Sequence, residues 1–443
     1  MKLWQKDKAS LREVDLFTVG NDREMDLYLA SADVLGSLAH IRMLESIGLL
    51  THQEWADLSA ELKQIHQGII GGTFRLEEGS EDIHSQIEEM LTRTLGDTGK
   101  KIHSGRSRND QVLVDIRIFL RLRLQELAES ARDFFNLLIS LSEKHRQDLY
   151  PGYSHLQIAM PSSFGLWFGA YAESLVDDLI LLEAAYRVVN KNPLGSAAGY
   201  GSSFPLNRSL TTELLGFDQL NYNVVYAQMG RGKTERVVAQ GLSNLAATLS
   251  RLAMDLCFYM NQDLGFVSFP DELTTGSSIM PHKKNPDVLE LIRAHCNRIQ
   301  SLPAEISLLT ANLPSGYHRD FQLLKEHLFP AFDTLKQCFS MASLMLSEMR
   351  IRKGILDEDK YRNLFSVEEV NRLVLEGIPF RDAYRAVGKQ IGEGSFKPTR
   401  EIHHTLEGSI GNLCNDQITR MMEEVWLDFH FDKPREAVQR LLS

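Results

Sequence analysis

The sequence predicts a mainly α-helical protein, organised as a central bundle of long helices with smaller helical domains at both ends. One observation is a set of segments that contain neither glycine nor proline. Strand signals are scarce by comparison, because alternation with a period of two is short wherever it occurs and no β-α-β rhythm develops. The segments free of glycine and proline cover residues 106–150, 170–192, 242–264, 287–302 and 331–353.

The first of these segments carries one continuous helical stripe. Its apolar residues recur in steps of three and four, a spacing typical of a long helix. At about 1.5 Å per residue, such a helix is roughly 50–60 Å long. Further apolar residues lie off the stripe, so we expect more than one buried face and an oligomer that covers the rest. The stripe consists of Leu113, Ile116, Leu120, Leu124, Leu127, Ala131, Phe134, Leu138 and Leu141.

Local signals suggest where the bundle ends. A glycine-rich interruption at 68–84 lies within a helical N-terminal region, and Gly354 closes the last long segment. We therefore expect an N-terminal helical domain at 1–105. The central bundle, which we expect to form the core of an oligomer, would cover 106–355, and a small helical domain 356–443.

Two helix starts are expected in the C-terminal region. Ser366 and Glu369 have the spacing of a capping box, in which the two side chains satisfy amides at a helix start. Pro379 lies near the start of the next helix, a position that proline favours. No internal repeat or low-complexity tract interrupts this arrangement.

Charge and composition exclude several classes of protein. The formal net charge of -11 argues against a general binder of nucleic acid or anionic membranes. Neither an apolar targeting segment at the N-terminus nor a bilayer-spanning run is visible. The four cysteines form no CxxC pair and are expected to be free thiols of a reducing compartment, so we expect a cytoplasmic protein. They are Cys257, Cys296, Cys338 and Cys414.

Residues 227–234, AQMGRGKT, fit a relaxed phosphate-loop pattern. An apolar NVVY precedes them and a helical segment follows. No strand ending in a magnesium-binding aspartate is evident, and a mainly helical chain offers no parallel sheet for such a loop. We favour a polar loop before a long helix, with Lys233 and Glu235 near its first turn.

Residues 274–287, TTGSSIMPHKKNPD, place two lysines and two serines on one kinked loop. Asn285, Pro286 and Asp287 resemble a helix start with a capping asparagine. Amides at that start, together with Lys283 and Lys284, could bind an anion. Composition alone leaves this site and a solvated connection equally open.

The loop also carries a family signature. GSSIMPHKKNP resembles the signature of the fumarase/aspartase superfamily, whose members are helical homotetramers that release fumarate from succinyl-containing substrates. Four further segments are similar to the argininosuccinate lyase family, and the matches extend from about residue 26 to residue 388. These segments are HSGRSRNDQV (103–112), GYSHLQIAMP (152–161), GYHRDFQLLK (316–325) and GIPFRDAYRAVG (377–388).

The resemblance implies cleavage of argininosuccinate to arginine and fumarate, without a cofactor or a metal, in a homotetramer whose active sites are shared between subunits. It implies that Ser277 removes the Cβ proton and that His155 supplies the proton or the activating hydrogen bond that the departing nitrogen needs. Lys283 and Asn285 would stabilise the adjacent carboxylate as its charge grows. Serine is a poor base, so loop amides and cations must favour its alkoxide.

Substrate positioning is implied for a second set of residues. For Arg108, a structural ion pair remains the alternative to a contact with substrate. Ser154 stands where the family usually has threonine. The implied substrate-binding residues are Asp26, His84, Ser107, Arg108, Asn109, Ser154, Asn285, Tyr317, Gln322 and Lys325.

Two segments depart from the family pattern. FTVGNDREMD (17–26) is longer than the usual approach to the acid aligned with Asp26, so no N-terminal substrate serine is expected. NYNVVYAQMGRGKTE (221–235) replaces a segment with a family arginine, which Arg231 or Lys233 could substitute. These departures leave open a related fumarate-releasing lyase, such as one that cleaves adenylosuccinate. A non-catalytic crystallin-like protein on this fold and a nucleotide-binding protein also remain open.

Overall fold

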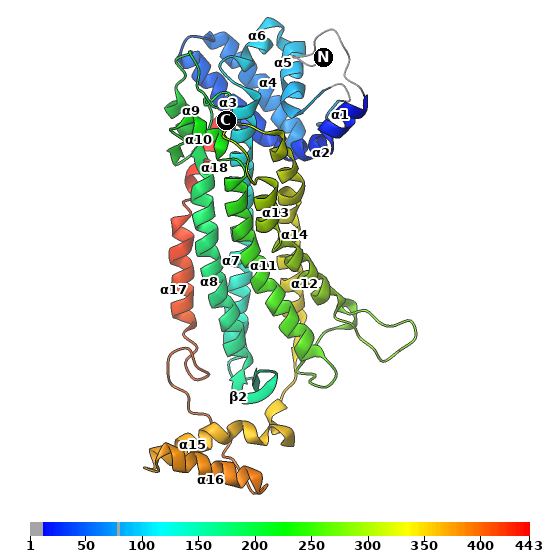
Figure 1. Ribbon diagram of the computed structural model, residues 1–443, viewed down its shortest axis with the longest axis vertical. Helices are drawn as coiled ribbons and strands as arrows, with labels where there is room; N and C mark the ends of the chain where they lie inside the picture. The colour runs from blue at the N-terminus through cyan, green and yellow to red at the C-terminus, as the bar shows by residue number, and fades with distance from the viewer. Residues whose placement is uncertain (1–11, 78–79) are drawn as a thin grey trace.

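The computed structural model describes residues 12–77 and 80–443, and it is an elongated, mainly helical molecule (Figure 1). Short N-terminal helices cover the upper end of a bundle of long helices, and a helical hairpin lies at the lower end. The predicted fold class is confirmed. Residues 1–11, where the sequence shows no apolar targeting segment, lie outside the described residues. Within the described part, no helix is long and apolar enough to cross a bilayer.

The bundle is built on α7 (Arg108–Lys144), whose 37 residues span about 55 Å. Its predicted stripe is buried, with Leu120, Leu124 and Leu127 at 0% exposure, and Ile118 off the stripe is buried as well. More than one face of α7 is therefore covered, as expected. The other long helices are α8 (Phe164–Val189), α11 (Lys233–Met260) and α14 (Leu323–Glu348), with α12 (Asp287–Ile299), α13 (Leu302–Leu309) and α17 (Asn415–Asp428) beside them.

Three of these helices extend beyond the segments free of glycine and proline. The start of α8 crosses Gly165, where an added Cβ would lie 2.6 Å from the Ser142 carbonyl oxygen of α7, so close helix packing requires glycine. Likewise, α11 runs across Gly241, which packs against α8. Pro330 lies inside α14 between the buried Phe329 and Phe332. Burial of these rings outweighs the amide hydrogen bond that proline cannot make.

The N-terminal helices form a second core above the bundle. Thr51 and Glu54 make a capping box at the start of α4. Asp82 caps α5 by accepting from the Ser85 amide. In chain order the elements are α1 (Arg12–Val19), α2 (Asp22–Asp26), η1 (Leu27–Leu29), α3 (Ala30–Ser46), α4 (His52–Ile70), α5 (Ile83–Leu95), α6 (Asp97–Lys100) and η2 (Lys101–His103).

The strands are short and form three two-stranded sheets in the described part of the chain. β1 (Leu149–Ser154) and β2 (Gln157–Ser163) make an antiparallel hairpin at the lower end of the bundle. β3 (Lys191–Asn192) pairs in parallel with β4 (Gln219–Leu220), and β5 (Val267–Ser268) pairs with β6 (Arg350–Ile351). Two short helices, α9 (Arg208–Leu214) and α10 (Val224–Met229), lie near the upper end.

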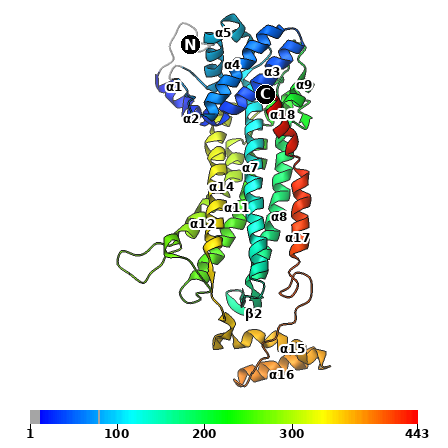
Figure 2. The same ribbon diagram turned by 180° about the vertical axis from the view of Figure 1, so that it is seen from behind.

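Residues 356–443 occupy both ends of the molecule (Figure 2). After η5 (Ile355–Asp357) and η6 (Asp359–Phe365), the helices α15 (Ser366–Leu375) and α16 (Phe380–Gly392) form the lower hairpin. The chain then returns along the bundle as α17, and α18 (Asp432–Leu442) contacts α3 and α9. A division into three domains stays a prediction.

The predicted capping box of the lower hairpin is wrong. α15 begins at Ser366 itself and has no side-chain cap. Glu369 instead pairs with Arg372 one turn later, at 2.7 Å. Pro379 does precede the first residue of α16, as expected.

Candidate active site

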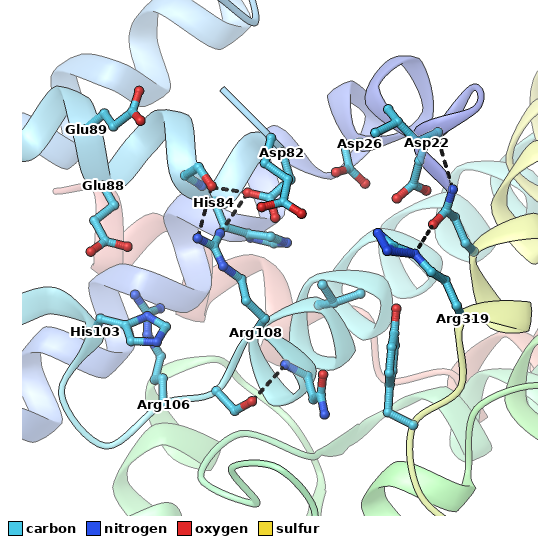
Figure 3. A pocket seen from close by; sticks show the side chains of 18 of the residues that line it. Asp22, Asp26, Asp82, His84, Glu88, Glu89, His103, Arg106, Arg108 and Arg319 are labelled. Carbon is cyan, nitrogen blue, oxygen red and sulfur yellow. Dashed lines mark hydrogen bonds and ion pairs between the residues drawn. The ribbon is translucent and has the colours of Figure 1, made fainter. Parts of the chain in front are cut away.

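A cavity of about 830 Å³ lies where the N-terminal helices meet the upper end of the bundle. Its walls come from α2, α5, the start of α7 and the segment before α14, which are far apart in sequence. In Figure 3, His84 and Arg108 lie together on one side, whereas Asp22, Asp26 and Arg319 lie on the other. Eight predicted site residues line it: Asp26, His84, Ser107, Arg108, Asn109, Tyr317, Gln322 and Lys325.

The HSGRSRND segment is held by the cap of α7. The Ser107 hydroxyl accepts from the Asn109 amide at 3.2 Å, and Asp110 completes a capping box with the Ser107 amide. The second oxygen of Asp110 accepts from the amides of Gly195 and Ala197, both at 2.9 Å. This network fixes Arg108 and Asn109 at a helix N-terminus, where the helix dipole favours an anion.

Arg108 makes an ion pair across the cavity wall. Its Nη1 donates to Asp82 Oδ1 at 2.7 Å, and its Nη2 donates to the Ser85 hydroxyl at 3.0 Å. The structural ion pair that the sequence left open for Arg108 is therefore present, and it joins the first turns of α5 and α7. A contact between Arg108 and substrate stays a prediction.

Lys325 lies deep in the opposite wall between two carboxylates. Its Nζ donates to Asp26 Oδ1 at 2.6 Å and also pairs with Asp22. Burial would lower the pKa of Lys325, but Asp26 and Asp22 raise it. Burial raises the pKa of Asp22 despite the lysine. Gln322 is oriented by donating to the carbonyl oxygens of Thr18 and Val19, at 3.1 and 2.9 Å.

Replacing Lys325 by methionine is expected to destabilise the protein by about 3–5 kcal/mol, because two largely buried carboxylates lose their cation. Burial raises the pKa of Asp22, so protonation of this carboxyl relieves part of the cost at low pH, and the loss should be larger at pH 8 than at pH 5. Thermal unfolding at the two pH values measures it. Lys336→Met is the matched control on the same helix, since Lys336 pairs with the half-exposed Glu126 and should cost about 1 kcal/mol or less. Equal losses in the two variants would contradict the expectation.

The remaining five predicted site residues lie away from this cavity. Ser154 and His155 are exposed at the tip of the β1–β2 hairpin, at the lower end of the bundle. Ser277, Lys283 and Asn285 belong to the loop that projects sideways before α12 (Figures 1 and 2). One chain thus holds the predicted residues in three separate groups.

The projecting loop is shaped by its own backbone. Thr275 and Asn285 form a bridge that closes it. The Ser277 hydroxyl accepts from the Met280 amide at 3.1 Å and from the Ile279 amide at 3.4 Å. Lys283 makes no ion pair with any described residue, whereas Lys284 pairs with Asp271. The two amides that donate to the Ser277 hydroxyl favour negative charge on its oxygen.

Asn285 does not cap α12, contrary to the sequence prediction. Pro286 takes the cap position and makes no side-chain cap hydrogen bond. The Asn285 side-chain amide instead donates to the Gly276 carbonyl oxygen at 3.3 Å and to the Thr275 hydroxyl at 3.4 Å. The Asn285 side chain therefore closes the loop and does not cap the helix.

The departing segment at 221–235 contributes one residue to the cavity. Arg231 lines it and is held by Glu235 at 2.8 Å and by the Phe321 carbonyl oxygen at 3.2 Å. Lys233, the other suggested substitute, is exposed and lies over the Tyr226 ring. The NVVY stretch belongs to α10 and not to a strand. The Gly232 amide donates to Glu235 at 2.7 Å, so this loop lacks the arrangement of a phosphate loop.

Sequence reasoning missed several charged residues of the cavity. Arg106 and Arg319 stand inside family-like segments, and Asp82 stands two residues before His84, so in each case a neighbour gave a signal. Asp22 lies in the segment that departs from the family pattern, so no motif pointed to it. The cavity also holds His103, whose pKa is lowered to about 4 by burial and by Arg106 and Arg108.

Comparison with known proteins identifies the family of this chain. A family model described as Lyase matches residues 14–301. An argininosuccinate lyase from Parabacteroides distasonis is 62% identical over 441 residues, covering 100% of this chain and 99% of the relative. The chain belongs to the argininosuccinate lyase family. A Bacteroides fragilis member is 61% identical, again over 100% and 99%, and a Thermotoga neapolitana member is 37% identical over 88% and 98%.

Solved structures agree on the fold of the family. EDDS lyase in complex with formate matches with a TM-score of 0.75 at 21% identity, over 98% of this chain and 94% of that one. A class II fumarase from Schistosoma mansoni matches with a TM-score of 0.70 at 14% identity, over 93% and 95%. At these identities the likeness extends to the fold alone.

Proposed function

We propose that the protein is a carbon-nitrogen lyase that cleaves argininosuccinate to arginine and fumarate, a step of arginine biosynthesis. The observation that carries this proposal is identity above 60% over the full chain to members of the argininosuccinate lyase family. The intact Ser277, His155 and Lys283 support an active enzyme over a crystallin-like protein without catalysis. Its four cysteines are free thiols, which is compatible with action in the cytoplasm.

In the proposed elimination, Ser277 takes a proton from the carbon next to a carboxylate. The electron pair moves towards that carboxylate, which Lys283 stabilises as a point charge and Asn285 through its amide. The bond from the adjacent carbon to the guanidino nitrogen then breaks, and His155 supplies the proton or hydrogen bond that the nitrogen needs. The loop amides at Met280 and Ile279 support the role of Ser277, because they already donate to its oxygen.

Substrate would be held in the cavity while these groups act on it. Asn109 lies in the first turn of α7 and would offer its side-chain amide to the substrate at the N-terminus of this helix. Tyr317, Gln322 and Lys325 would contact the substrate from the opposite wall, with Asp26 fixing the lysine. Ser107 would act mainly by capping α7. Ser154 would contact the substrate next to His155.

We further propose a homotetramer in which each active site combines the three groups from different subunits. Separation of the cavity, the hairpin and the loop within one chain supports this assembly. Exposed apolar side chains on the bundle support it too, because a lone bundle would leave them in water. They include Ile180, Leu181, Met254, Leu291 and Leu344, each at least 42% exposed.

The function is tested by the ultraviolet absorbance of fumarate after purified protein is mixed with argininosuccinate. Adenylosuccinate serves in a parallel reaction. A rise with argininosuccinate alone is the expected result. A rise with adenylosuccinate instead would replace the proposal with the related lyase, and no rise with either would contradict both.

Sharing of active sites predicts recovery of activity when two inactive variants are mixed. Ser277→Ala carries a defective loop and Asn109→Ala a defective cavity. After unfolding and refolding together in equal amounts, about one quarter of the sites should combine an intact loop with an intact cavity. Fumarate release at about a quarter of the wild-type rate is expected. Two variants of the same loop, Ser277→Ala and Lys283→Ala, form the control that should recover nothing.

A further inference from the structure

A buried group of ionisable side chains lies behind one wall of the cavity. It consists of Asp33 on α3, His84 on α5 and Asp115 on α7, and none of the three is more than 3% exposed. His84 Nδ1 lies 2.8 Å from Asp33 Oδ1 and 3.4 Å from Asp115 Oδ2. Three helices thus bring two carboxyl groups onto the same nitrogen of one imidazole.

The hydrogen bonds of this group are incomplete if both aspartates are ionised. Asp33 Oδ1 accepts from His84 and also from Gln111 Nε2 at 2.7 Å. Asp33 Oδ2 and both oxygens of Asp115 have no hydrogen-bond donor among the described residues. Unsatisfied carboxylate oxygens cost free energy when buried, so a proton on Asp115 that faces Asp33 removes the largest defect.

The other nitrogen of His84 is a buried atom in a side chain that lines the cavity. Nε2 has no hydrogen-bond partner among the described residues, and His84 lines the cavity beside Arg108 (Figure 3). Since Nδ1 donates to Asp33, a protonated imidazole would present its Nε2–H to whatever occupies the cavity.

Charges on all sides of the group favour this distribution of protons. Burial and the charge of Asp33 raise the pKa of Asp115 well above its usual range, with Asp26 adding to this effect and Arg106 opposing it. Burial alone would raise the pKa of Asp33, but His84, Arg106 and Gln111 lower it to about 2.

The same balance holds for the imidazole. Burial would lower the pKa of His84, but Asp33 and Asp82 raise it, and Arg108 opposes them. His40 also belongs to this buried region, and burial and Arg106 lower its pKa well below the usual value. Of His84 and His40, His84 is therefore the one that carries the positive charge.

We propose that Asp33 and Asp115 share one proton and are positioning residues, which hold His84 as an imidazolium whose Nε2–H binds a carboxylate of the ligand. This proposal rests on the proposed function, which supplies a substrate with several carboxylates. It assigns His84 the role of a charged donor and gives two residues outside every sequence motif a part in substrate binding.

The same three side chains could instead hold a cation, because their ligand atoms lie within 4.8 Å of one another. The amide donor from Gln111 already occupies Asp33 Oδ1, and the nearby Arg106 is a positive charge beside both carboxyl groups, so a proton is favoured over a metal. A metal is an outcome that the experiment distinguishes.

The experiment compares Asp115→Asn with Asp33→Asn in the full-length protein. Asparagine copies a neutral carboxyl group, so Asp115→Asn should keep kcat/KM within about threefold of wild type. Asp33→Asn should raise KM at least about tenfold with a smaller change in kcat, because the ionic partner of His84 is lost. In the pH profile of kcat/KM for Asp33→Asn, the fall in activity on the basic side should begin at a lower pH than in wild type. Equal losses in the two variants would overturn the proposal.

Thermal unfolding tests the shared proton without any turnover. A raised pKa of Asp115 means that its contribution to stability is present at low pH and is lost as the pH rises from the unfolded pKa through the folded one. The difference in Tm between Asp115→Asn and wild type should therefore shift in favour of the variant as the pH rises from 5 to 8. For Asp33, whose pKa is lowered, the contribution is present throughout this window, so Asp33→Asn should lower Tm at both values. An unchanged pH dependence in Asp115→Asn would overturn the proposal.

Three further outcomes keep the test decisive. If wild type cleaves neither substrate, the proposed function fails, whereas the Tm comparison still judges the shared proton. If Asp115→Asn does not fold, infrared spectroscopy of wild type at pH 8 should show a protonated-carboxyl band that is sensitive to His84→Gln, and an insensitive spectrum would overturn the proposal. If chelation lowers the Tm of wild type and Mn²⁺ restores it, the group binds a metal and the proposal is wrong.

Discussion

Replacing Ser277 by alanine is expected to lower kcat by at least about 10³-fold, within the range that a positioned general base contributes. Its hydroxyl accepts from the Met280 and Ile279 amides, at 3.1 and 3.4 Å on an exposed loop. Alanine removes the oxygen that takes the proton, yet no buried contact is lost. Steady-state fumarate release measures the effect, and thermal unfolding and size-exclusion chromatography should match wild type.

Ser278→Ala is the matched control for this prediction. It removes the same hydroxyl one position later on the same exposed loop, so it reproduces any general loosening of the loop. Its activity should exceed that of Ser277→Ala by at least about 10²-fold if one oxygen is the base. Near-normal turnover in Ser277→Ala, or equal loss in the two variants, would remove Ser277 from this role.

Helical periodicity predicted the fold because burial follows it closely. The stripe on α7 repeats every three to four residues, and its members are buried against neighbouring helices. Helix ends were less predictable, because they depend on packing partners that lie far away in sequence. Pro330 continues a helix between buried aromatic rings, and the first turn of α8 needs glycine at 165 because Ser142 lies against it.

Family motifs predicted a large part of the cavity, although not how its residues are held. Ser107, Arg108 and Asn109 are consecutive, so one motif found all three. Their geometry depends on Asp82 and on the amides of a loop near residue 195 that donate to Asp110, and no local pattern connects these to the motif. Asp33 and Asp115 lie far apart in sequence and meet only through His84, so their proximity is a property of the fold.

The charge environment of Lys325 comes from a different segment than the motif that contains it. Lys325 belongs to the GYHRDFQLLK segment, but its environment is set by Asp22 and Asp26, from a segment that departs from the family pattern. A basic residue in such a pair binds an incoming carboxylate less strongly than a free one, because the two acids already compensate its charge. If substrate binds at this wall as proposed, its affinity there depends on segment 17–26 together with the motif.

Replacing His155 by asparagine is expected to lower kcat by about 10²- to 10⁴-fold, because the departing nitrogen loses its proton donor. Asparagine suits the test because His155 has a left-handed backbone, with φ of 54°, and Asn adopts this conformation more readily than most residues. The hairpin should keep its shape, since the exposed ring makes no hydrogen bond within the described part of the chain. Fumarate release with argininosuccinate measures the effect.

The pH profile distinguishes a proton donor from a residue that only shapes the hairpin. If His155 protonates the leaving nitrogen, the basic limb of kcat should disappear in His155→Asn, whereas a shape change would lower the whole profile equally. His403→Asn is the control, since His403 is exposed outside every proposed site and should leave the profile unchanged. A full profile of normal shape in His155→Asn would move leaving-group protonation to another residue. The cavity histidine His84 would be tested next, because it lines the cavity and its buried Nε2 has no hydrogen-bond partner among the described residues.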